Sequence, residues 1–409
     1  MFLIVLVDVL GFTIVIPLLG LYAERFGASP LTATLIVSCY AVSSLISTPI
    51  IGKLSDQFGR RPLLLISQAG TCAGFLILGA SSALWMVFVG RILDGLTAGN
   101  LSLAQAYISD HTKPENRAKA FAVIGIAFGI GFMFGPLVGG VLGKYGMHYP
   151  FLLAASLSAL SMFCTYTLLP REEKKPDALP VAEVVGPGGK RPSAFDVATY
   201  TNYFGRPELR SLYLQFFLFT FSFSAFISGF ALYAERRFVT AAGHAWTATE
   251  VGYLFAYSGL IGILWQGGAI GRLVKKFGEI KLTSVAFIAS IIGYVVISLI
   301  PNDRILPLAL ITIVSSFGHG VLRPVLTSRI TQAVGRHEQG IAIGISGSLS
   351  SLAMMMAPPT GGFLLDHGWL DGWPMVPAVM SLFGLLVALA TRNRTPASAP
   401  PAPGLSSAP

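Results

Sequence analysis

The chain is organised as twelve apolar runs of about twenty residues, separated by short polar segments. The first six runs cover residues 2–22, 31–51, 63–80, 84–107, 120–143 and 149–169, and the second six cover residues 210–233, 249–271, 281–300, 305–328, 340–364 and 373–391. A helix needs about 20 apolar residues to cross a bilayer core, so each run predicts a transmembrane helix. We expect an all-α integral membrane fold with twelve transmembrane helices in two pseudo-symmetric six-helix bundles.

Two polar segments divide the chain further. Residues 170–209 are rich in Pro, Gly and charge and are too polar to span, so they predict a cytoplasmic linker with an interfacial helix near 194–204. Residues 392–409 are of low complexity and predict a disordered cytoplasmic tail. The expected domains are the N-terminal bundle 1–169, the linker 170–209, the C-terminal bundle 210–391 and the tail 392–409.

Composition agrees with a lipid environment. Hydrophobic residues make up 53% of the chain and charged residues 11%, against about 25% charged in a typical soluble domain. A chain with so few charges cannot cover a water-exposed surface of this size. The three cysteines, Cys39, Cys72 and Cys164, lie inside apolar runs and are interpreted as small apolar side chains without a disulfide framework.

The positive charge of the chain reports its orientation. If both termini are cytoplasmic, most Lys and Arg residues fall in the inner loops, as the positive-inside rule requires. The inner loops would hold Lys53, Arg60, Arg61, Lys113, Arg117, Lys119, Arg171, Lys174, Lys175, Arg272, Lys275, Lys276 and Lys281, and the outer loops Arg25, Lys144, Arg236, Arg237 and Arg304. The net charge of +9 is therefore a topology signal, and we expect no nucleic-acid partner. A multi-pass protein of the plasma membrane, here a bacterial inner membrane, is predicted.

The two halves carry similar segments in the same order. The sequence LYAERFG at 21–27 recurs as LYAERRF at 232–238, GKLSDQFGRR at 52–61 recurs loosely as GRLVKKFGEI at 271–280, and GPLVGG at 135–140 recurs as PPTGG at 358–362. The nearly constant spacing predicts an internal duplication, the pattern of transporters whose halves rock about a central site. The Glu–Arg pairs at 24–25 and 235–236 either bridge the halves at the outer side or are solvated helix ends.

The loop after the second run has a distinctive composition. In GKLSDQFGRRP, Gly52 and Gly59 permit tight backbone turns, and Asp56, Arg60 and Arg61 can form charge-assisted hydrogen bonds. Such a cluster can hold one conformation and release it in another. A merely solvated basic loop is the alternative.

This loop resembles the signature loop of the major facilitator superfamily, and the closest resemblance is to its drug/proton antiporter branch, the tetracycline-resistance-like transporters. The resemblance covers about residues 1–391 and includes SSALWMVFVGR at 81–91 and DGW at 371–373. It implies that Asp56, Arg60 and Arg61 form a latch between the halves that favours the outward-facing state, with Asp110 as a partner.

A second motif lies in the fifth run. Gly131, Gly135, Pro136, Gly139 and Gly140 bring small residues to one helix, which permits close helix packing and a proline bend. The string GIGFMFGPLVGG resembles the antiporter motif of proton-coupled drug exporters. The resemblance implies exchange of substrate for protons, whereas the glycines alone predict only tight packing.

Ionisable residues inside the runs are candidates for proton and substrate binding, because charge at membrane depth is costly. We place Asp8, Arg91 and Asp94 in a proton-coupling cluster; Arg91 lies in GRILDG, which resembles the arginine motif of the superfamily's fourth helix. The alternatives are an interfacial position for Asp8 and a structural ion pair for Arg91 with Asp94 or Asp8.

In the second half, His319 and Arg323 lie four residues apart on one helix face. They face a substrate cavity and meet an anionic group or a proton path, or Arg323 extends to the cytoplasmic surface. In the eighth helix, Gly262 stands where the tetracycline exporters carry a histidine, although Gln266 remains. The acidic residues of those exporters are missing from the third and ninth runs, so the resemblance covers the scaffold and leaves open whether tetracycline is a substrate.

Together these features predict a secondary active transporter that exports a small amphipathic or drug-like molecule by proton-coupled alternating access. The expected partners are a small-molecule substrate, protons and the lipid bilayer, with a monomeric chain, no cofactor, no metal and no enzymatic activity; no nucleotide-binding or metal-binding motif occurs in the sequence. The alternatives are a facilitator or importer of a sugar, organic acid or other metabolite and, more distantly, a non-transporting membrane receptor.

Overall fold

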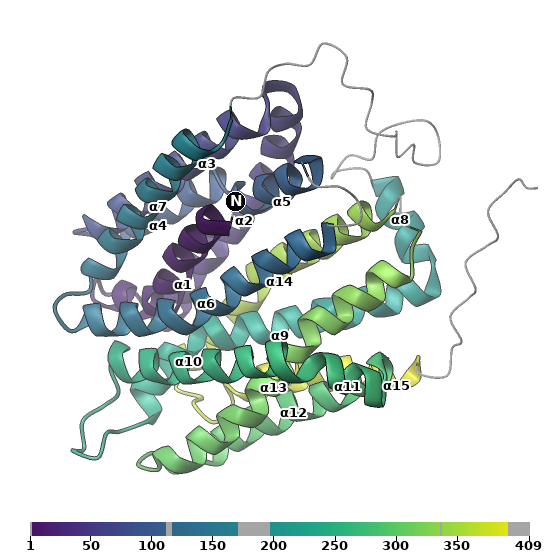
Figure 1. Cartoon of the computed structure of the whole chain (residues 1–409). Helices are drawn as coiled ribbons and strands as arrows, with labels where there is room; N and C mark the ends of the chain where they lie inside the picture. The colour runs from purple at the N-terminus through teal and green to yellow at the C-terminus, as the bar shows by residue number, and fades with distance from the viewer. Residues whose placement is uncertain (1, 112–116, 171–196, 336–337, 392–409) are drawn as a thin grey trace, which may run out of the picture.

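The computed structural model describes residues 2–111, 117–170, 197–335 and 338–391, with the side chains of 109–125 and 197–200 excluded. Within these ranges the fold is helical, and its only bridge of extended backbone joins Val239 to Ala245. Figure 1 shows the N-terminal helices, in purple and blue, as one group beside the teal to yellow helices of the C-terminal half. The predicted linker residues 171–196 and tail 392–409 lie outside the described residues.

Helices of the first half follow the predicted runs closely. They are α1 (Phe2–Glu24), α2 (Pro30–Phe58), α3 (Arg60–Gly79), α4 (Leu84–Leu96), α5 (Asn100–His111), α6 (Arg117–Gly143) and α7 (Tyr149–Leu168).

The second half begins with the short helix α8 (Val197–Gly205), close to the predicted interfacial helix. It continues with α9 (Pro207–Arg237), α10 (Ala248–Ile263), a π-helical turn (Leu264–Ala269), α11 (Ile270–Phe277), α12 (Glu279–Leu299), α13 (Ile305–Gln332), α14 (Gln339–Asp366) and α15 (Met375–Ala390).

Ten helical segments of the described chain are long and apolar enough to cross a membrane. The prediction of a continuous helix over 84–107 is wrong, because α4 ends at Leu96 and α5 begins at Asn100. Ser67 of α3 explains the break: its hydroxyl contacts the carbonyl oxygen of Thr97 and accepts from the amide of Gly99 at 2.9 Å. These bonds replace helical ones, so α4 and α5 together occupy the fourth run. The twelfth run forms the shorter helix α15.

The duplicated loops have the same backbone conformation. Gly59 separates α2 from α3 with φ 94° and ψ 156°, and Gly278 separates α11 from α12 with φ 75° and ψ 156°. Positive φ is readily adopted only by glycine, so each loop needs its glycine for the reversal. The 219-residue spacing of these two glycines equals the spacing of Gly52 and Gly271.

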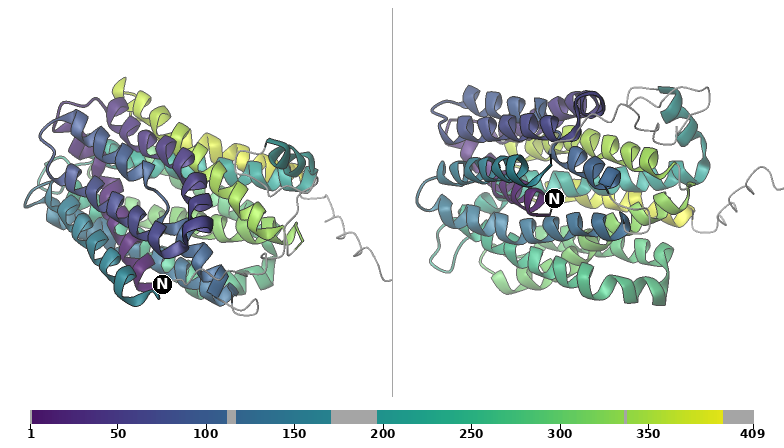
Figure 2. Two further views of the ribbon diagram at one scale, coloured as in Figure 1. Left: turned by 90° about the horizontal axis from the view of Figure 1, so that it is seen from above. Right: turned by 45° about the horizontal axis from the view of Figure 1, so that its top comes forward.

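The halves pack against each other in a two-fold pattern. Within the first half α1 packs on α6 and α7, and α3 on α4 and α7; within the second, α9 packs on α14 and α15, and α12 on α13 and α15. Across the halves, α2 packs on α14 and α6 packs on α10. Because α2 corresponds to α10 and α6 to α14, exchange of the halves maps one contact onto the other. Figure 2 shows the helices of both halves running side by side.

Close backbone contacts join the halves at one end, which we call the closed end. It contains the C-terminal end of α1 and the N-terminal ends of α2 and α10. A Cβ atom added to Gly140 of α6 would lie 2.6 Å from the carbonyl oxygen of Ala248, and one added to Gly362 of α14 would lie 2.9 Å from that of Pro30. Glycine is therefore required for this approach of the helices.

At the opposite end, which we call the open end, the same helix pairs lack such contacts. A Cβ atom added to Gly52 of α2, or to Gly344 or Gly347 of α14, would meet no atom within 4 Å. The same holds for Gly267 and Gly271 beyond α10. The open end lies at the right of Figure 1, near α8, α11 and α15. The structure is thus closed toward one side of the membrane and open toward the other.

An ion pair at the open end links the start of α9 to α14. Arg206 Nη2 donates to Glu338 Oε1 at 2.8 Å, and Arg206 Nη1 donates to Glu338 Oε2 at 3.1 Å. The hydrogen bonds from Arg206 hold the pKa of Glu338 below its usual range. A carboxyl whose pKa is lowered by folding contributes stability above its unfolded pKa, and this contribution is lost as the pH falls through the folded value.

We expect Glu338→Gln to lower the thermal stability of the purified protein at pH 7 by at most about 1 kcal/mol, because both side chains are partly exposed. The difference from wild type should shrink below about pH 4, near the usual range of glutamate. Thermal unfolding of both proteins in detergent between pH 3.5 and 8 measures it. A difference that grows on acidification would contradict this account of the pair.

Candidate functional site

An ion pair is buried inside the first half. Arg91 Nη1 donates to Asp94 Oδ2 at 2.7 Å, and both side chains are at most 5% exposed. The guanidinium lies 4.2 Å from the ring centroid of Tyr40 on α2, a distance that suits a cation–π contact. Thr71 of α3 is a further polar neighbour of Asp94. The alternative in which Arg91 forms an ion pair with Asp94 is the one observed, and the pair lies against α2 and α3.

Small residues allow this pair to be buried. A Cβ atom added to Gly74 of α3 would lie 2.8 Å from the carbonyl oxygen of Gly90 on α4. The two helices are therefore in direct backbone contact beside Asp94. Water is excluded from the pair, which strengthens its electrostatic interaction and raises the cost of losing either partner.

Asp8 of α1 lies near the Arg91–Asp94 pair but is not part of it. Its carboxyl group is beside Gln68 of α3 and Ser161 of α7, and its Oδ1 atom is buried without a hydrogen-bond partner among the described residues. Gln68 Nε2 also donates to Ser161 Oγ at 2.8 Å. Asp94 is near enough to interact electrostatically, but no ion pair between Asp8 and Arg91 is observed in the described chain. The three residues thus form two adjacent sites, one paired and one without a cation.

The Asp8 site can support two protonation states. Amide and hydroxyl donors from Gln68 and Ser161 can stabilise the carboxylate, while the lack of a cation leaves a buried oxygen able to carry a proton. The site is on α1, whose other faces pack on α6 and on α9 of the second half. A change of charge at Asp8 is therefore next to a helix that contacts both halves.

The glycine motif of α6 forms two contact faces. Cβ atoms added to Gly131, Gly135 and Gly139 would all collide with α1, and Gly131 also accepts a hydrogen bond from Thr13 Oγ1 at 2.8 Å. Gly140 faces α10 instead, where Thr249 Oγ1 donates to its carbonyl oxygen at 3.0 Å.

Pro136 adds a further contact on this second face. Its carbonyl oxygen would lie 2.5 Å from a Cβ atom added to Gly252 of α10. The motif thus binds α6 tightly to its own half on one face and to the other half on the other face.

The latch residues are engaged within the first half. Asp56 pairs with Arg60 at 2.6 Å, and Arg61 Nη2 donates to the carbonyl oxygen of Tyr166 at 2.6 Å. The Asp56 side chain remains 55% exposed. Its expected partner Asp110 lies in α5, and the Asp110 side chain is outside the described residues. None of the described ion pairs makes the contact between Asp56 and the second half that was expected of the latch. This agrees with the separation of the halves at the open end.

The two candidate residues of α13 have different surroundings. His319 Nε2 is 2.6 Å from the hydroxyl oxygen of Tyr294 on α12, and its ring contacts Phe223 and Phe226 of α9. Arg323 is exposed and has no ion-pair or hydrogen-bond partner among the described side chains. Gln266 is in the π-helical turn, and its Nε2 would lie 3.7 Å from a Cβ atom on Gly320. π-Helical turns are frequent at functional sites.

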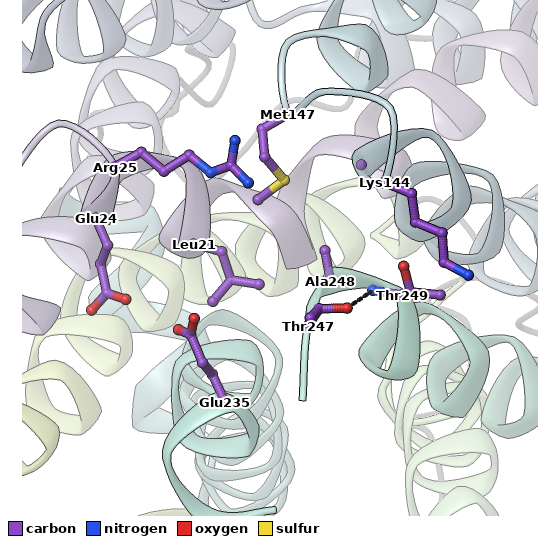
Figure 3. A pocket seen from close by; sticks show the side chains of 10 residues that line it. Leu21, Glu24, Arg25, Lys144, Met147, Glu235, Thr247, Ala248 and Thr249 are labelled. Atoms are coloured by element: carbon purple, nitrogen blue, oxygen red, sulfur yellow. Dashed lines mark hydrogen bonds between the residues drawn. The ribbon is translucent and has the colours of Figure 1, made fainter. Parts of the chain in front are cut away.

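The repeated Tyr-Ala-Glu-Arg segments meet at the closed end. Glu24 of α1 and Arg236 of α9 form an ion pair between the halves. Glu24 also lines a pocket of about 550 Å³, together with Arg25, Lys144 and Glu235. Figure 3 shows the Glu24 and Glu235 carboxylates facing each other across from Lys144. The alternative in which these residues bridge the halves is thus the observed one.

Several polar neighbours were not identified from the sequence. Tyr40, Gln68, Ser161 and Tyr294 each lie beside a candidate residue, and each is an uncharged polar residue inside an apolar run. Gln68 carries the clearest signal, because an amide fully buried in a membrane helix needs partners. A search for uncharged polar residues at span centres would have selected it.

The buried pair generates a stability prediction. Arg91→Gln should destabilise the protein by about 3–5 kcal/mol, because it leaves the Asp94 carboxylate buried without its cation. The double variant Arg91→Gln/Asp94→Asn should recover a large part of that loss, because no charge is then buried. Thermal unfolding in detergent of wild type and both variants provides the comparison. If the double variant is as unstable as the single one, packing of Arg91 rather than charge pairing dominates.

Comparison with known proteins agrees with this arrangement. The model of the Major Facilitator Superfamily matches residues 1–312 and 241–408. The class B tetracycline resistance protein of Escherichia coli is 30% identical over 90% of this chain and 89% of its own length. Multidrug resistance protein 1 of Bacillus subtilis strain 168 is 27% identical over 87% of this chain and 86% of its own length.

A solved structure supports the fold independently of sequence. The inward-facing, unoccupied structure of a bacterial homologue of the human lysosomal transporter Spinster superposes with a TM-score of 0.72. It is 15% identical and covers 96% of this chain and 95% of that one. The sequence match, the duplicated halves and the fold lead to one conclusion: the chain is a multi-pass membrane protein that belongs to the Major Facilitator Superfamily.

Proposed function

We propose that this protein is a proton-coupled exporter of small amphipathic or drug-like molecules that works by alternating access in the plasma membrane. The observation that carries the proposal is the Asp8 carboxyl, whose Oδ1 atom is buried without a hydrogen-bond partner among the described residues, on the helix that contacts both halves. The tetracycline and multidrug resistance proteins named above are relatives that share the scaffold. The expected functional unit is a monomer with bundles 1–169 and 210–391, joined by the linker 170–209.

The open end faces the cytoplasm in this proposal. Lys53, Arg60 and Arg61 lie there, as do Lys275 and Lys276 of the duplicated loop. Cytoplasmic loops carry the excess of Lys and Arg. The structure then represents an inward-open state, which is ready to take substrate from the cytoplasm, and both termini are cytoplasmic.

The transport cycle follows from the two contacts that must alternate. At the closed end, the Glu24–Arg236 pair and the glycine contact of Gly140 must separate to release substrate outward. At the open end, the Asp56 loop must then close against the second half. Arg91 and Asp94 hold α4 rigid, so the first half moves as one body.

Asp8 couples this movement to protons in our proposal. A proton bound from the outer side neutralises the buried carboxyl and lowers the cost of its burial. Release of that proton toward the cytoplasm restores the charge, which Gln68 and Ser161 then stabilise. Substrate leaves and a proton enters in each cycle, with no chemical change to the substrate.

We expect Asp8→Asn to abolish transport that is driven by a pH gradient, because Asn cannot change its charge. Proteoliposomes with an imposed pH gradient would measure the rate with fluorescent dyes of both charges, such as ethidium and fluorescein. Asp303→Asn is the matched control, since Asp303 is 61% exposed in a loop at the closed end. Full pH-driven transport by both Asp8→Asn and Arg91→Ala would contradict the proposed coupling site.

The ion pair at the closed end makes a separate prediction. Glu24→Arg should reduce transport severalfold, because two cations then meet at the contact between the halves. The reversed pair Glu24→Arg/Arg236→Glu should restore much of the rate. Transport assays in the same proteoliposomes compare the three proteins. Equal loss in the single and double variants would show that the pair does not hold the closed end.

A further inference from the structure

The second half contains a cation at membrane depth without a matching anion. Arg323 lies nine residues before the end of α13, so its Cα is about 13 Å from that helix end at 1.5 Å per residue. The acidic residues of the described second half are all near helix ends or in loops: Glu208, Glu235, Glu250, Glu279, Asp303, Glu338, Asp366 and Asp371. No carboxylate of this half is therefore positioned to neutralise Arg323.

The direction of the Arg323 side chain follows from its helical neighbours. Successive helix residues are rotated by about 100°, so Arg323 is about 40° from His319 and about 60° from Gly320 around α13. His319 contacts α9 through Phe223 and Phe226, and Gly320 faces Gln266 beyond α10. Arg323 thus points between α9 and α10, which make few contacts with each other.

Aromatic side chains from both halves lie near Arg323. Phe223 of α9 has its ring centroid 6.3 Å from that of Phe132 on α6, in the first half. Phe132 is in turn 6.4 Å from Phe128. All three are only partly buried, so their rings border the space between the halves. An apolar ligand has a surface to contact here, one to two helix turns from Arg323.

The carboxyl groups of the first half do not compensate Arg323. Asp94 is neutralised by Arg91 and enclosed by α2 and α3. Asp8 is directed toward Gln68 and Ser161 on α3 and α7, which lie behind α1 as seen from the second half. Among the side chains that the structure describes, Arg323 is therefore a cationic group without a carboxylate partner, near the aromatic rings of Phe223 and Phe132.

We propose that the exported molecule is an amphipathic anion, with a carboxylate or sulfonate bound by Arg323 and an aromatic or aliphatic body against Phe223 and Phe132. This inference rests on the proposed export function and specifies its substrate class. An arginine fork binds such an anion through two parallel hydrogen bonds. The Gln266 amide is on the adjacent helix and offers a further donor to the same group.

The test uses two dyes that share a xanthene body and differ in charge, anionic fluorescein and cationic rhodamine 123. Export by the full-length protein is measured in proteoliposomes under a pH gradient, and binding is measured by dye anisotropy with the protein in detergent. We expect wild type to prefer fluorescein, and Arg323→Gln to weaken fluorescein binding about tenfold or more, as for a lost hydrogen bond to a charged group.

Variants separate charge from folding. Arg323→Lys should retain part of the fluorescein binding, and Arg323→Glu should shift the preference toward rhodamine 123. Arg304→Gln is the matched control, because Arg304 is 70% exposed at the other end of α13. This variant should bind fluorescein as wild type does. Thermal unfolding of each variant confirms that it is folded.

The outcomes distinguish this inference from the proposed function. Export of rhodamine 123 without export or binding of fluorescein would overturn the anionic substrate and retain the exporter. Fluorescein binding that depends on Arg323 without flux of either dye would retain the anionic site and contradict export. Equal fluorescein binding by wild type and Arg323→Gln would overturn the inference in every case.

Discussion

Close backbone contact across glycines is the constraint on which this structure depends. Lipid tails are as apolar as the helices they surround, so helix association in a membrane rests on close packing and hydrogen bonds. Gly140 against α10 and Gly362 against α2 provide that packing at the closed end. Because both contacts are made by glycines that present no side chain of their own, the two helix surfaces can separate without unfolding either half. The same residues therefore hold the halves together and allow them to part.

Charge inside each half follows a different rule from charge between the halves. Arg91 and Asp94 are enclosed and paired, so they stabilise the packing of α4 inside the first half. Glu24 and Arg236 pair across the halves and must separate once per cycle. A surface pair is weak enough to break repeatedly, whereas a buried pair is not. The position of each pair thus matches the movement that the scaffold requires.

The sequence predicted most of the fold because membrane helices are encoded locally. Twelve apolar runs, the repeated glycine loops and the segments around Glu24 and Glu235 identified two halves and their order. The break at Thr97–Gly99 could not be predicted, because it depends on Ser67 from a different helix. The surroundings of Asp8 were missed for the same reason: three helices bring Gln68 and Ser161 to it, and no spacing along the chain reports that meeting.

The charge distribution also bears on the energy available for export. In the proposed cycle the first half holds Asp8 as the carboxyl that exchanges a proton, and the second half holds Arg323. If an anion leaves while a proton enters, both movements carry positive charge inward. Each elementary charge that crosses the membrane contributes about 2.3 kcal/mol per 100 mV, so an inside-negative potential drives both steps in the same direction. Exchange of a cation for a proton would gain nothing from that potential. An anionic substrate therefore lets one carboxyl and one arginine, placed in opposite halves, use the whole electrochemical gradient.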